Sequence, residues 1–378
     1  MVNLIFSFLQ QSILKLQEKW KVDFMSKMKS ARFYRQGEPL RIEYVEIPKI
    51  GPSDVLIQVK ACGLTPSMIP SRKMIPPLKK VPVTYGHQFS GIIAEVGEAV
   101  EGFRKGDRVF IDYYVGCNKC PACLSGRHYS CSKFSVIGKN WGDGGLAEFV
   151  RVPATNVFIL PDAISFEEGA LIFDPIGVGF HAVRRGNVKG GSTVAVYGGG
   201  GAVGTSIIQA AKVDGAGLII AVDTYDHRLD LARKLGADET VNSKNVNPVK
   251  KIKDLTDEKG VDIAFDACGG MGIAGEIGNV TYEQAMASTR FGGRTVIVST
   301  SWGTFKCDPL RFALEEFELI GSHGCPRADI STILKLLLQG KIQIKPIISH
   351  TFSLDEVNYA LDILKRQTGE VNKIIIKI

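Results

Sequence analysis

The chain has 378 residues, of which 45% are hydrophobic and 22% are charged, and its formal net charge is +7 at pH 7. A chain of this length and hydrophobic content can bury a sizeable core and is expected to divide into two domains. The charge is mild and no basic stripe with interleaved aromatic residues is present, which argues against a nucleic-acid partner. No apolar run approaches the roughly 20 residues that cross a bilayer, so no membrane span is expected.

The opening segment, residues 1–27, differs in character from the rest of the chain. Apolar residues 4–9, followed by the mixed segment 10–20, predict an amphipathic helix. The apolar part is too short for a secretion signal, and no small-residue cleavage site follows it. We interpret the segment as an accessory N-terminal extension, or as sequence upstream of a native start at Met25 or Met28, with a docking or membrane-surface helix as the alternative.

Short alternating strands begin near residue 29 and predict a barrel-like β domain. Turn-forming residues, such as those around Gly37 and Gly51, separate these strands. The predicted strands are 30–34, 40–45, 55–61, 91–96 and 108–110.

Four closely spaced cysteines, Cys117, Cys120, Cys123 and Cys131, form the clearest metal-binding pattern in the sequence. Three thiols at every third position and a fourth further along let a tight loop offer four sulfurs tetrahedrally to one zinc ion. No coordination position stays open, so we predict one structural zinc per chain. An iron–sulfur cluster would favour a shorter final spacing that ends in Cys-Pro. The other cysteines are scattered singly, as in a reduced cytoplasmic protein without disulfides.

A glycine-rich turn follows the predicted strand 193–197 and precedes the predicted helix 207–212. Gly199, Gly201 and Gly204 keep the spacing of a dinucleotide-binding turn between a strand and a helix. In such a turn the first glycine makes the bend, the second admits the pyrophosphate, and the third lets the helix pack on the strand. The pattern therefore predicts a nicotinamide dinucleotide site.

An acidic residue at the end of the next apolar run strengthens this prediction. Asp223 follows residues 218–222 and lies about 20 residues after the turn, where a carboxylate can accept both hydroxyls of the adenosine ribose. The same carboxylate repels a 2′-phosphate, so NAD is favoured over NADP. Arg228 and His227 lie nearby and leave NADP as the alternative.

From residue 192 to residue 320 apolar runs alternate with helical stretches, which is typical of a parallel sheet with crossover helices. Two of the predicted helices are 229–235 and 282–291. A helix at 330–339 and a last strand at 373–378 are expected to return to the first domain. The nucleotide domain would then be an insertion in the β domain.

Six segments that are spread along the chain can be compared with known families. They are Gly86-His-Gln-Phe-Ser-Gly91, Gly106-Asp-Arg-Val109, the four-cysteine segment, Gly144-Gly-Leu-Ala-Glu148, Phe173-Asp-Pro175 and the glycine turn. In these segments residues 28–378 resemble the zinc-containing medium-chain dehydrogenases, the group that includes alcohol, polyol and threonine dehydrogenases. The resemblance implies an α/β chain with a GroES-like β-barrel catalytic domain and a Rossmann domain built on a doubly wound parallel sheet. The active site would lie in the cleft between them.

The resemblance also implies domain limits and an assembly. The catalytic domain would cover 28–175 with its structural zinc segment, the Rossmann domain 176–322, and the return to the catalytic domain 323–378. A homodimer or homotetramer is expected by analogy.

The sequence departs from the family where the catalytic zinc is held. Thr65 stands at the position of a ligand cysteine, and Gln88 replaces the glutamate that often follows the ligand histidine, present here as His87. Asp174 remains as a carboxylate ligand or a nearby base. Because a threonine hydroxyl keeps its proton and a glutamine amide carries no charge, any zinc here would be weakly bound. A neutral hydrogen-bonded His87 and a turn-capping Asp174 are the structural alternatives.

Two further roles follow from the resemblance. Ser67 stands at the position of a proton-relay hydroxyl. Lys373, at the start of the last strand, stands where family members carry a cation that touches the cofactor pyrophosphate; otherwise it is a surface lysine.

Three functions remain open at this point. In the first, a degenerate zinc site at His87 and Asp174 polarises a small alcohol while hydride passes to the nicotinamide of NAD(P). In the second, no catalytic zinc binds, and His87, Thr65 or Ser67 donates a proton to a conjugated carbonyl or holds its oxyanion. In the third, the chain binds the dinucleotide as a sensor without turnover.

Overall fold

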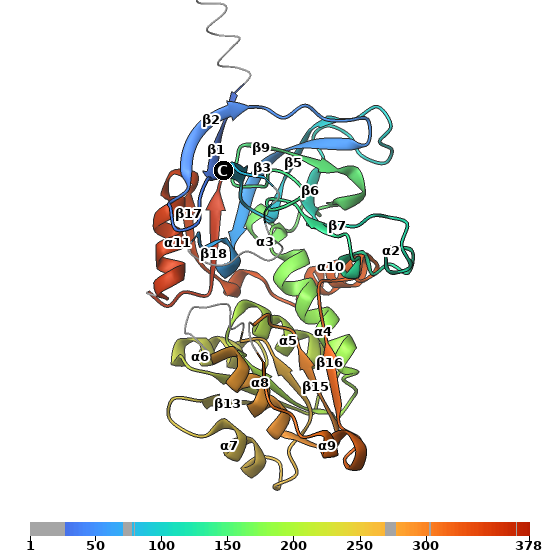
Figure 1. Cartoon of the computed structure of the whole chain (residues 1–378), viewed down its shortest axis with the longest axis vertical. Coiled ribbons are helices and arrows are strands. Elements are labelled where there is room, and N and C mark those ends of the chain that lie inside the picture. The colour runs from blue at the N-terminus through green and yellow to red at the C-terminus, as the bar shows by residue number, and fades with distance from the viewer. Residues whose placement is uncertain (1–26, 71–77, 79, 269–276, 302–303, 368) are drawn as a thin grey trace, which may run out of the picture.

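The computed structural model describes residues 27–70, 78, 80–268, 277–301, 304–367 and 369–378. The N-terminal extension lies outside these residues, apart from Lys27, which begins the first strand. The described chain forms two lobes along the long axis of the molecule, and its first and last segments lie together in the upper lobe (Figure 1).

The upper lobe is a β-barrel domain whose main sheet has the strand order β10-β6-β5-β3-β18-β17, with β9 also paired to β3. Neighbouring strands are antiparallel except for β17 and β18. Val55, Ile57 and Val59 of the central strand β3 are at most 1% exposed, as expected for alternate residues that face a core. The strands of this sheet are β3 (Asp54–Leu64), β5 (Gln88–Val96), β6 (Arg108–Ile111), β9 (Phe149–Pro153), β10 (Val157–Ile159), β17 (Ile348–Ser353) and β18 (Lys373–Lys377).

Smaller elements complete this lobe. A second sheet has the order β2-β1-β4, and β7 pairs with β8 beside the four-cysteine segment. The strands are β1 (Lys27–Phe33), β2 (Arg41–Glu46), β4 (Val83–Thr84), β7 (Tyr114–Val115) and β8 (Ser135–Val136). The short helical turns are η1 (Pro66–Met68), α2 (Pro121–Leu124), η2 (His128–Ser130), η3 (Ala154–Asn156), α3 (Phe166–Gly169) and η4 (Ile172–Gly177).

The lower lobe contains a parallel six-stranded sheet with the order β13-β12-β11-β14-β15-β16. The chain starts at the central strand β11 and reverses direction after β13, so right-handed crossovers place helices on both faces of the sheet. The strands are β11 (Thr193–Tyr197), β12 (Leu218–Asp223), β13 (Glu239–Asn242), β14 (Val261–Asp266), β15 (Thr289–Ile297) and β16 (Glu318–Gly321). The helices are α4 (Val178–Gly186), α5 (Ala202–Val213), α6 (Asp226–Lys234), α7 (Pro248–Asp254), α8 (Ile277–Ala287) and α9 (Pro309–Leu314). This is the doubly wound sheet expected from the sequence.

The C-terminal segment returns to the upper lobe, as predicted. Ile375 of β18 pairs antiparallel with Gly63 of β3, which brings the last strand beside the strand that leads to Thr65 (Figure 1). The first and last parts of the chain therefore build the same end of the barrel. The remaining elements of this segment are η5 (Arg327–Asp329), α10 (Ile330–Leu338), η6 (Lys345–Ile347), η7 (Leu354–Glu356) and α11 (Val357–Arg366).

One predicted helix is wrong in its second half. The pattern predicted a helix over 282–291, whereas α8 ends at Ala287 and β15 begins at Thr289. β15 lies between two parallel neighbours, β14 and β16, and this pairing outweighs the local helical pattern. The other predicted strands and helices lie within a few residues of the observed ones.

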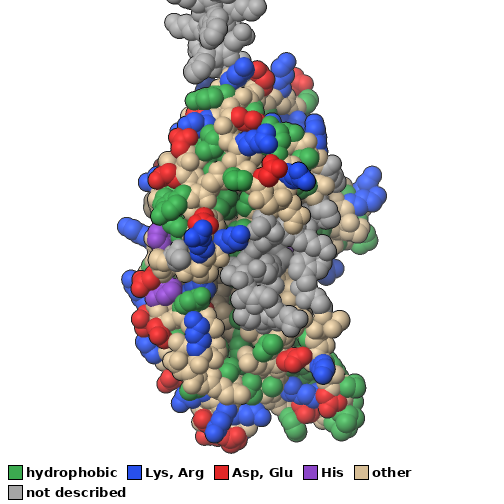
Figure 2. Space-filling view, turned by 60° about the vertical axis from the view of Figure 1, so that its left-hand side comes forward, with side chains coloured by type: hydrophobic (Ala, Val, Ile, Leu, Met, Phe, Trp, Pro, Cys, Tyr) green, Lys and Arg blue, Asp and Glu red, His purple; other side chains and the backbone are tan. Residues whose placement is uncertain are grey.

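The surface carries mixed charge on the face shown in Figure 2, where the described Lys and Arg side chains are interspersed with Asp and Glu. A nucleic-acid backbone requires a continuous basic track, which this face lacks. Among the helices that the structure describes, none has the length and apolar character to cross a membrane.

Candidate active site

A cleft of about 390 Å³ is lined by residues of both lobes. One wall comes from the barrel, and the opposite wall from the glycine turn and the start of α5. The predicted catalytic residues Thr65, Ser67, His87 and Asp174 all line it, together with the predicted cofactor residues Gly201, Arg228 and Lys373. Gly199, Gly204 and Asp223 do not line it, so the fold brings the predicted catalytic residues and half of the predicted cofactor residues to a single cavity.

The glycine turn depends on close backbone contacts. Gly198 carries a left-handed φ of 73°. The N–H of Gly201 donates to the carbonyl oxygen of Gly198 at 3.0 Å, which closes a turn with Gly199 at its first central position, where the sequence predicted the bend. Gly199 also packs against β12, because a Cβ there would lie 2.8 Å from that of Ala221. A Cβ on Gly204 would lie 2.0 Å from the carbonyl oxygen of Gly198, which explains why α5 crosses the turn at a glycine.

Gly201 differs from the other glycines because its open side faces the cleft. It is the N-cap of α5, and a Cβ added to it would approach only the carbonyl oxygen of Gly198, at 3.3 Å. The backbone N–H groups at the start of a helix attract a phosphate, and the missing side chain leaves room for one. The turn therefore fits the pyrophosphate of a dinucleotide.

Asp223 ends β12 beside this turn and is 7% exposed. One of its carboxylate oxygens accepts a hydrogen bond from the N–H of Gly200 at 3.1 Å, and the other accepts one from the N–H of Thr224 at 2.7 Å. These bonds fix the carboxylate at the turn, where the adenosine ribose of a bound dinucleotide would lie.

Arg228 lies on α6, and the C-terminal segment holds its guanidinium. The Nη2 atom donates to the side chain of Gln367 and, at 3.0 Å, to the carbonyl oxygen of Val371. The guanidinium also lies 5.2 Å from the ring centroid of Tyr225. Through these hydrogen bonds, Arg228 links α6 of the lower lobe to the C-terminal segment of the upper lobe.

The barrel end of the cleft contains a buried lysine that the sequence analysis did not select. Lys139 lines the cleft and is only 7% exposed. Lys139 follows Gly138, and the backbone of Gly138 packs closely against that of Gly86, the residue before His87. A Cβ on Gly138 would lie 2.6 Å from the carbonyl oxygen of Gly86. This close packing, which requires glycine at φ 74°, places the lysine at the floor of the cleft.

Lys139 belongs to a chain of hydrogen bonds with two of the predicted residues. Its Nζ donates to the Oγ of Ser67 at 3.1 Å. The Oγ of Ser67 lies 2.8 Å from the Oγ1 of Thr65, and either hydroxyl can donate in that bond. A lysine, a serine and a threonine are therefore connected in one line along the cleft.

Asp174 borders the same floor. Its carboxylate accepts a hydrogen bond from the hydroxyl of Tyr113 at 2.9 Å. Burial, followed by the charge of Asp174, raises the pKa of Tyr113 well above its ordinary value, so the phenol stays protonated as a donor. The Tyr113 ring lies edge-on to that of His87, with 4.8 Å between the centroids.

Lys373 is the second buried lysine of the cleft, at 5% exposure. It stands at the start of β18, one residue before Ile374, which pairs with Leu64 of β3. Burial lowers its pKa to about 8, while the charges of Asp174 and Cys62 act in the opposite direction. Its charged neighbours are therefore at the barrel end of the cleft.

Burial and the two lysines keep His87 neutral. Burial lowers the pKa of His87 well below its ordinary value, and the charges of Lys139 and Lys373 lower it further. Its Nδ1 is buried and has no hydrogen-bond partner among the described residues. A neutral imidazole carries one N–H donor and one acceptor nitrogen, so His87, which lines the cleft, can hydrogen-bond to a ligand.

The residues around His87 do not fit a catalytic zinc. Within the part of the chain that the structure describes, the four cysteines are the one group of three or more His, Cys, Asp or Glu side chains that could hold a metal. Among the described residues, His87 and Asp174 have no third such ligand beside them, and the neighbouring hydroxyls are weak donors. The lysines add positive charge where a dication would have to bind.

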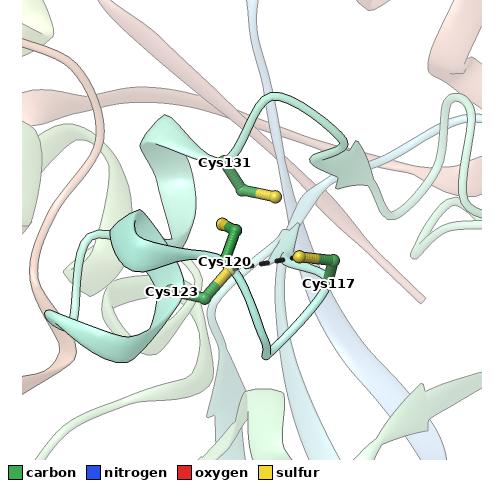
Figure 3. A group of neighbouring side chains, drawn as sticks. All are labelled: Cys117, Cys120, Cys123 and Cys131. Atoms are coloured by element: carbon green, nitrogen blue, oxygen red, sulfur yellow. Dashed lines mark hydrogen bonds between the residues drawn. The ribbon is translucent and has the colours of Figure 1, made fainter.

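The four cysteines do fit a structural zinc. Their sulfur atoms all lie within 4.8 Å of one another, and the side chains converge from the loop around α2 and from the end of η2 (Figure 3). Hydrogen bonds from the backbone N–H groups of Lys119 and Cys120 lower the pKa of the Cys117 thiol to about 6, which favours the thiolate that zinc requires. We therefore propose that Cys117, Cys120, Cys123 and Cys131 hold the zinc.

A buried carboxylate connects this cysteine segment to the rest of the molecule. Asp112, 0% exposed, lies 2.6 Å from the Nε2 of His128 and accepts a hydrogen bond from the Nε of Arg327 at 2.8 Å. His128 belongs to η2, which ends at Cys131, and Arg327 belongs to the returning C-terminal segment. Loss of the metal would therefore disturb two separate parts of the chain.

The sequence analysis missed Lys139 and the two tyrosines Tyr113 and Tyr114. The hydroxyl of Tyr114 lies 2.8 Å from the Nε2 of His323, and both residues line the cleft. The one available signal was the position of Lys139 next to Gly138, in a loop between two family-like segments. Such a loop lysine is ordinarily solvent-exposed, so the signal is weak.

The fold and the site together define a two-domain dinucleotide-dependent oxidoreductase. Residues 51–162 match the family model described as the alcohol dehydrogenase GroES-like domain, and residues 202–339 match the zinc-binding dehydrogenase model. The chain belongs to this zinc-type medium-chain dehydrogenase family, and it is an alcohol dehydrogenase-like oxidoreductase.

Individual relatives support the same assignment. The chain is 30% identical over 357 residues to the sorbitol dehydrogenase of Bacillus subtilis, covering 92% of this chain and 97% of the relative. Among solved structures, a zinc-binding dehydrogenase of Sinorhizobium meliloti bound to NADP is 29% identical, with a TM-score of 0.83 and coverage of 93% of this chain and 100% of that chain. An Escherichia coli alcohol dehydrogenase in complex with NADH is 26% identical, with a TM-score of 0.83 and the same coverage.

Proposed function

We propose that the chain is an NAD(P)-dependent oxidoreductase that transfers a hydride between nicotinamide and a small alcohol or carbonyl substrate, with a structural zinc and no catalytic zinc. The observation that carries this proposal is the cleft itself, which joins a fitting dinucleotide turn to a polar floor. Two buried lysines accompany His87 at that floor, in place of a set of metal ligands. A bound nicotinamide would donate or accept the hydride.

Reduction of a conjugated carbonyl is a second candidate, and the same observation favours it. Such a carbonyl is already electron-poor, so its reduction depends less on a Lewis acid. Thr65, Ser67 and His87 all line the cleft and can hydrogen-bond to a substrate oxygen. The choice between a simple and a conjugated carbonyl rests on assay.

The first test counts zinc and follows cofactor turnover in the same preparation. Elemental analysis should find about one tightly held zinc per chain. Titration of NADH fluorescence should show binding, and NADH should be oxidised by a member of a panel of ketones, aldehydes and enones. Two tightly held zincs would contradict the metal-free site. Binding of NADH without oxidation by any panel member would instead support the dinucleotide sensor.

Asp223 is proposed to favour NAD over NADP. Its carboxylate lies at the turn, and Asp223→Asn removes the charge that repels a 2′-phosphate. The amide oxygen can still accept one of the two local N–H bonds, whereas the amide NH2 group cannot accept the other. Because a hydrogen bond to a charged group contributes about 1.5–3 kcal/mol, we expect NADH affinity to fall roughly tenfold or more, with NADPH affinity unchanged or higher. Fluorescence titrations with both cofactors measure this ratio.

The matched control is Asp230→Asn. Asp230 lies on α6, has 75% of its side chain exposed, and should leave both affinities unchanged. Equal NADH and NADPH affinities in the wild type would remove the role proposed for Asp223.

The domain limits and the assembly are also proposals. We propose the limits 28–175, 176–322 and 323–378. The limit after residue 322 is supported by β16, the last strand of the parallel sheet, which precedes it, and by β17 and β18 of the barrel sheet, which follow it. A homodimer or homotetramer is supported by the exposed apolar side chains near the β16 edge of the parallel sheet, at Phe291 and Leu314.

A further inference from the structure

Lys139 lies at an unusual depth for its residue type, because lysine side chains are mostly exposed in folded proteins. Lys139 is 7% exposed, lines the cleft, and donates a hydrogen bond to Ser67 at 3.1 Å. The close packing of Gly138 against Gly86 fixes its loop beside His87. The backbone is therefore arranged to hold this lysine at the catalytic end of the cleft.

The hydrogen bond of Lys139 leaves the Ser67 hydroxyl able to act on a ligand. The ammonium group occupies one lone pair of the Ser67 oxygen, while the hydroxyl proton stays available to Thr65 or to a bound substrate. Ser67 and Lys139 both line the cleft, so a substrate oxygen can contact either. The Ser67 hydroxyl can therefore donate a proton to a substrate oxygen while the Lys139 ammonium group stabilises negative charge on the same oxygen.

The charge balance at the floor points to a ligand that becomes negative. Lys139 and Lys373 both interact with a single carboxylate, that of Asp174, which also accepts a hydrogen bond from Tyr113. His87 is neutral and adds no charge. Among the described residues named here, the floor carries two lysines against one carboxylate, which is complementary to an oxyanion developing on a carbonyl oxygen.

We propose that Lys139, through Ser67, takes the place of the catalytic metal by stabilising and protonating the carbonyl oxygen of the substrate. The proposal rests on the proposed function, because it requires a hydride from the nicotinamide. The hydride forms a C–H bond at the carbonyl carbon, and the C=O π electrons move to the oxygen. The oxygen takes the proton of Ser67, Ser67 takes one from the Lys139 ammonium, and solvent reprotonates the amine. Alcohol oxidation runs through the same steps in reverse.

The acidity of Lys139 suits this role. Burial lowers its pKa to about 8, although the charge of Asp174 acts in the opposite direction. A group with this pKa both donates and regains a proton near neutral pH, which is the condition for general acid catalysis.

The activity test uses Lys139→Met and Lys139→Arg with the panel carbonyl that the wild type reduces best. We expect Lys139→Met to lower kcat by roughly 100- to 10,000-fold, with NADH affinity within about twofold of the wild type. Lys139→Arg keeps the charge and should retain more activity than Lys139→Met. Lys105→Met, in an exposed loop of the barrel lobe, is the matched control and should leave kcat unchanged.

The pH profile separates a catalytic role from a structural one. Wild-type kcat for reduction should fall above about pH 8, as Lys139 loses its proton, and this limb should be absent in Lys139→Met. Among the described residues, Asp174 and His87 interact electrostatically with Lys139, and both also interact with Lys373. Because His87 stays neutral at these pH values, it does not produce the limb.

A binding measurement tests the lysine without turnover. Benzoate, whose carboxylate resembles an oxyanion, should bind the protein–NAD⁺ complex at least about tenfold more weakly after Lys139→Met, which corresponds to 1.4 kcal/mol. Uncharged benzyl alcohol should bind within about twofold of the wild type. Calorimetric titrations at pH 7 and pH 9.5 should also show wild-type affinity for benzoate decreasing at the higher pH.

Stability provides the check on folding. The lowered pKa of Lys139 means that the folded state binds fewer protons than the unfolded state between about pH 8 and the ordinary lysine value of 10.5. The cost of burying the charge is therefore fully present below pH 8 and disappears as the pH rises through this window. Removal of the charge by Lys139→Met should raise the thermal midpoint at pH 7, which rules out unfolding as the cause of lost activity.

The outcomes are distinguishable. If the wild type reduces a panel carbonyl and Lys139→Met keeps kcat within about threefold together with the limb above pH 8, the role of Lys139 is overturned while the proposed function stands. If the wild type oxidises NADH with no panel member, the proposed function fails. Unchanged benzoate affinity in Lys139→Met would overturn the oxyanion site in either case.

Discussion

Replacing Cys131 with serine is expected to release the structural zinc and to destabilise the barrel lobe. The four sulfurs lie within 4.8 Å of one another, so each thiolate is one of four ligands to the same ion. A hydroxyl keeps its proton at neutral pH and is a poor substitute. Because apparent zinc-binding free energies of structural sites reach about 10–16 kcal/mol at pH 7, loss of the ion should cost several kcal/mol of stability.

The effect should extend into the cleft. Cys131 directly follows Tyr129 and Ser130 of η2. The Tyr129 side chain leaves no room for a side chain at Gly324, where an added Cβ would lie 2.7 Å from the Cβ of Tyr129. His323, next to Gly324, is bonded to Tyr114 in the cleft wall. We therefore expect weaker NADH oxidation as well as a lower thermal midpoint.

Elemental analysis and thermal unfolding of the same samples test this prediction. Cys307→Ser removes a partly exposed thiol outside the zinc site, and it should keep about one zinc per chain with an unchanged midpoint. A Cys131→Ser protein that retains its zinc and its midpoint would show that the four cysteines serve another purpose.

The zinc site and the glycine turn could be predicted from the sequence because their parts are close together in the chain. Cys117 to Cys131 lie in one loop region, and their spacing alone determines that four sulfurs can converge. The glycine turn similarly carries its strand, bend and helix in one continuous segment. The turn is closed by a hydrogen bond from Gly201 to Gly198, with Gly199 between them.

The floor of the cleft could not be predicted in the same way, because tertiary structure assembles it. Lys139 and Ser67 are 72 residues apart, and Tyr113 and Asp174 are 61 apart. The sequence showed that ligands for a catalytic zinc were missing at Thr65 and Gln88. It contained no local pattern to indicate that a lysine from a glycine-flanked loop occupies the same end of the cleft.

Gly201→Ala is expected to weaken NADH binding and Gly204→Ala to lower stability, although both replace a glycine of the same turn. A Cβ on Gly204 would lie 2.0 Å from the carbonyl oxygen of Gly198 and 2.7 Å from the Cα of Gly199, and neither backbone atom can move cheaply. Overpacking of this kind costs about 1–3 kcal/mol or more, so Gly204→Ala should lower the thermal midpoint. A Cβ on Gly201 would meet only the carbonyl oxygen of Gly198, at 3.3 Å, so Gly201→Ala should fold normally.

The affinity for NADH should distinguish the two variants. The methyl group of Gly201→Ala would occupy the space beside the N-terminus of α5 in which a pyrophosphate approaches the backbone. If that clash also costs about 1–3 kcal/mol, NADH affinity should fall roughly 10- to 100-fold in a protein of wild-type stability. Fluorescence titration and thermal unfolding measure both quantities, and Gly190→Ala, where a Cβ would have no neighbour within 4 Å, is the control. Wild-type NADH affinity in Gly201→Ala would place the pyrophosphate elsewhere, and the hydride would then lack a defined path to the floor around Lys139.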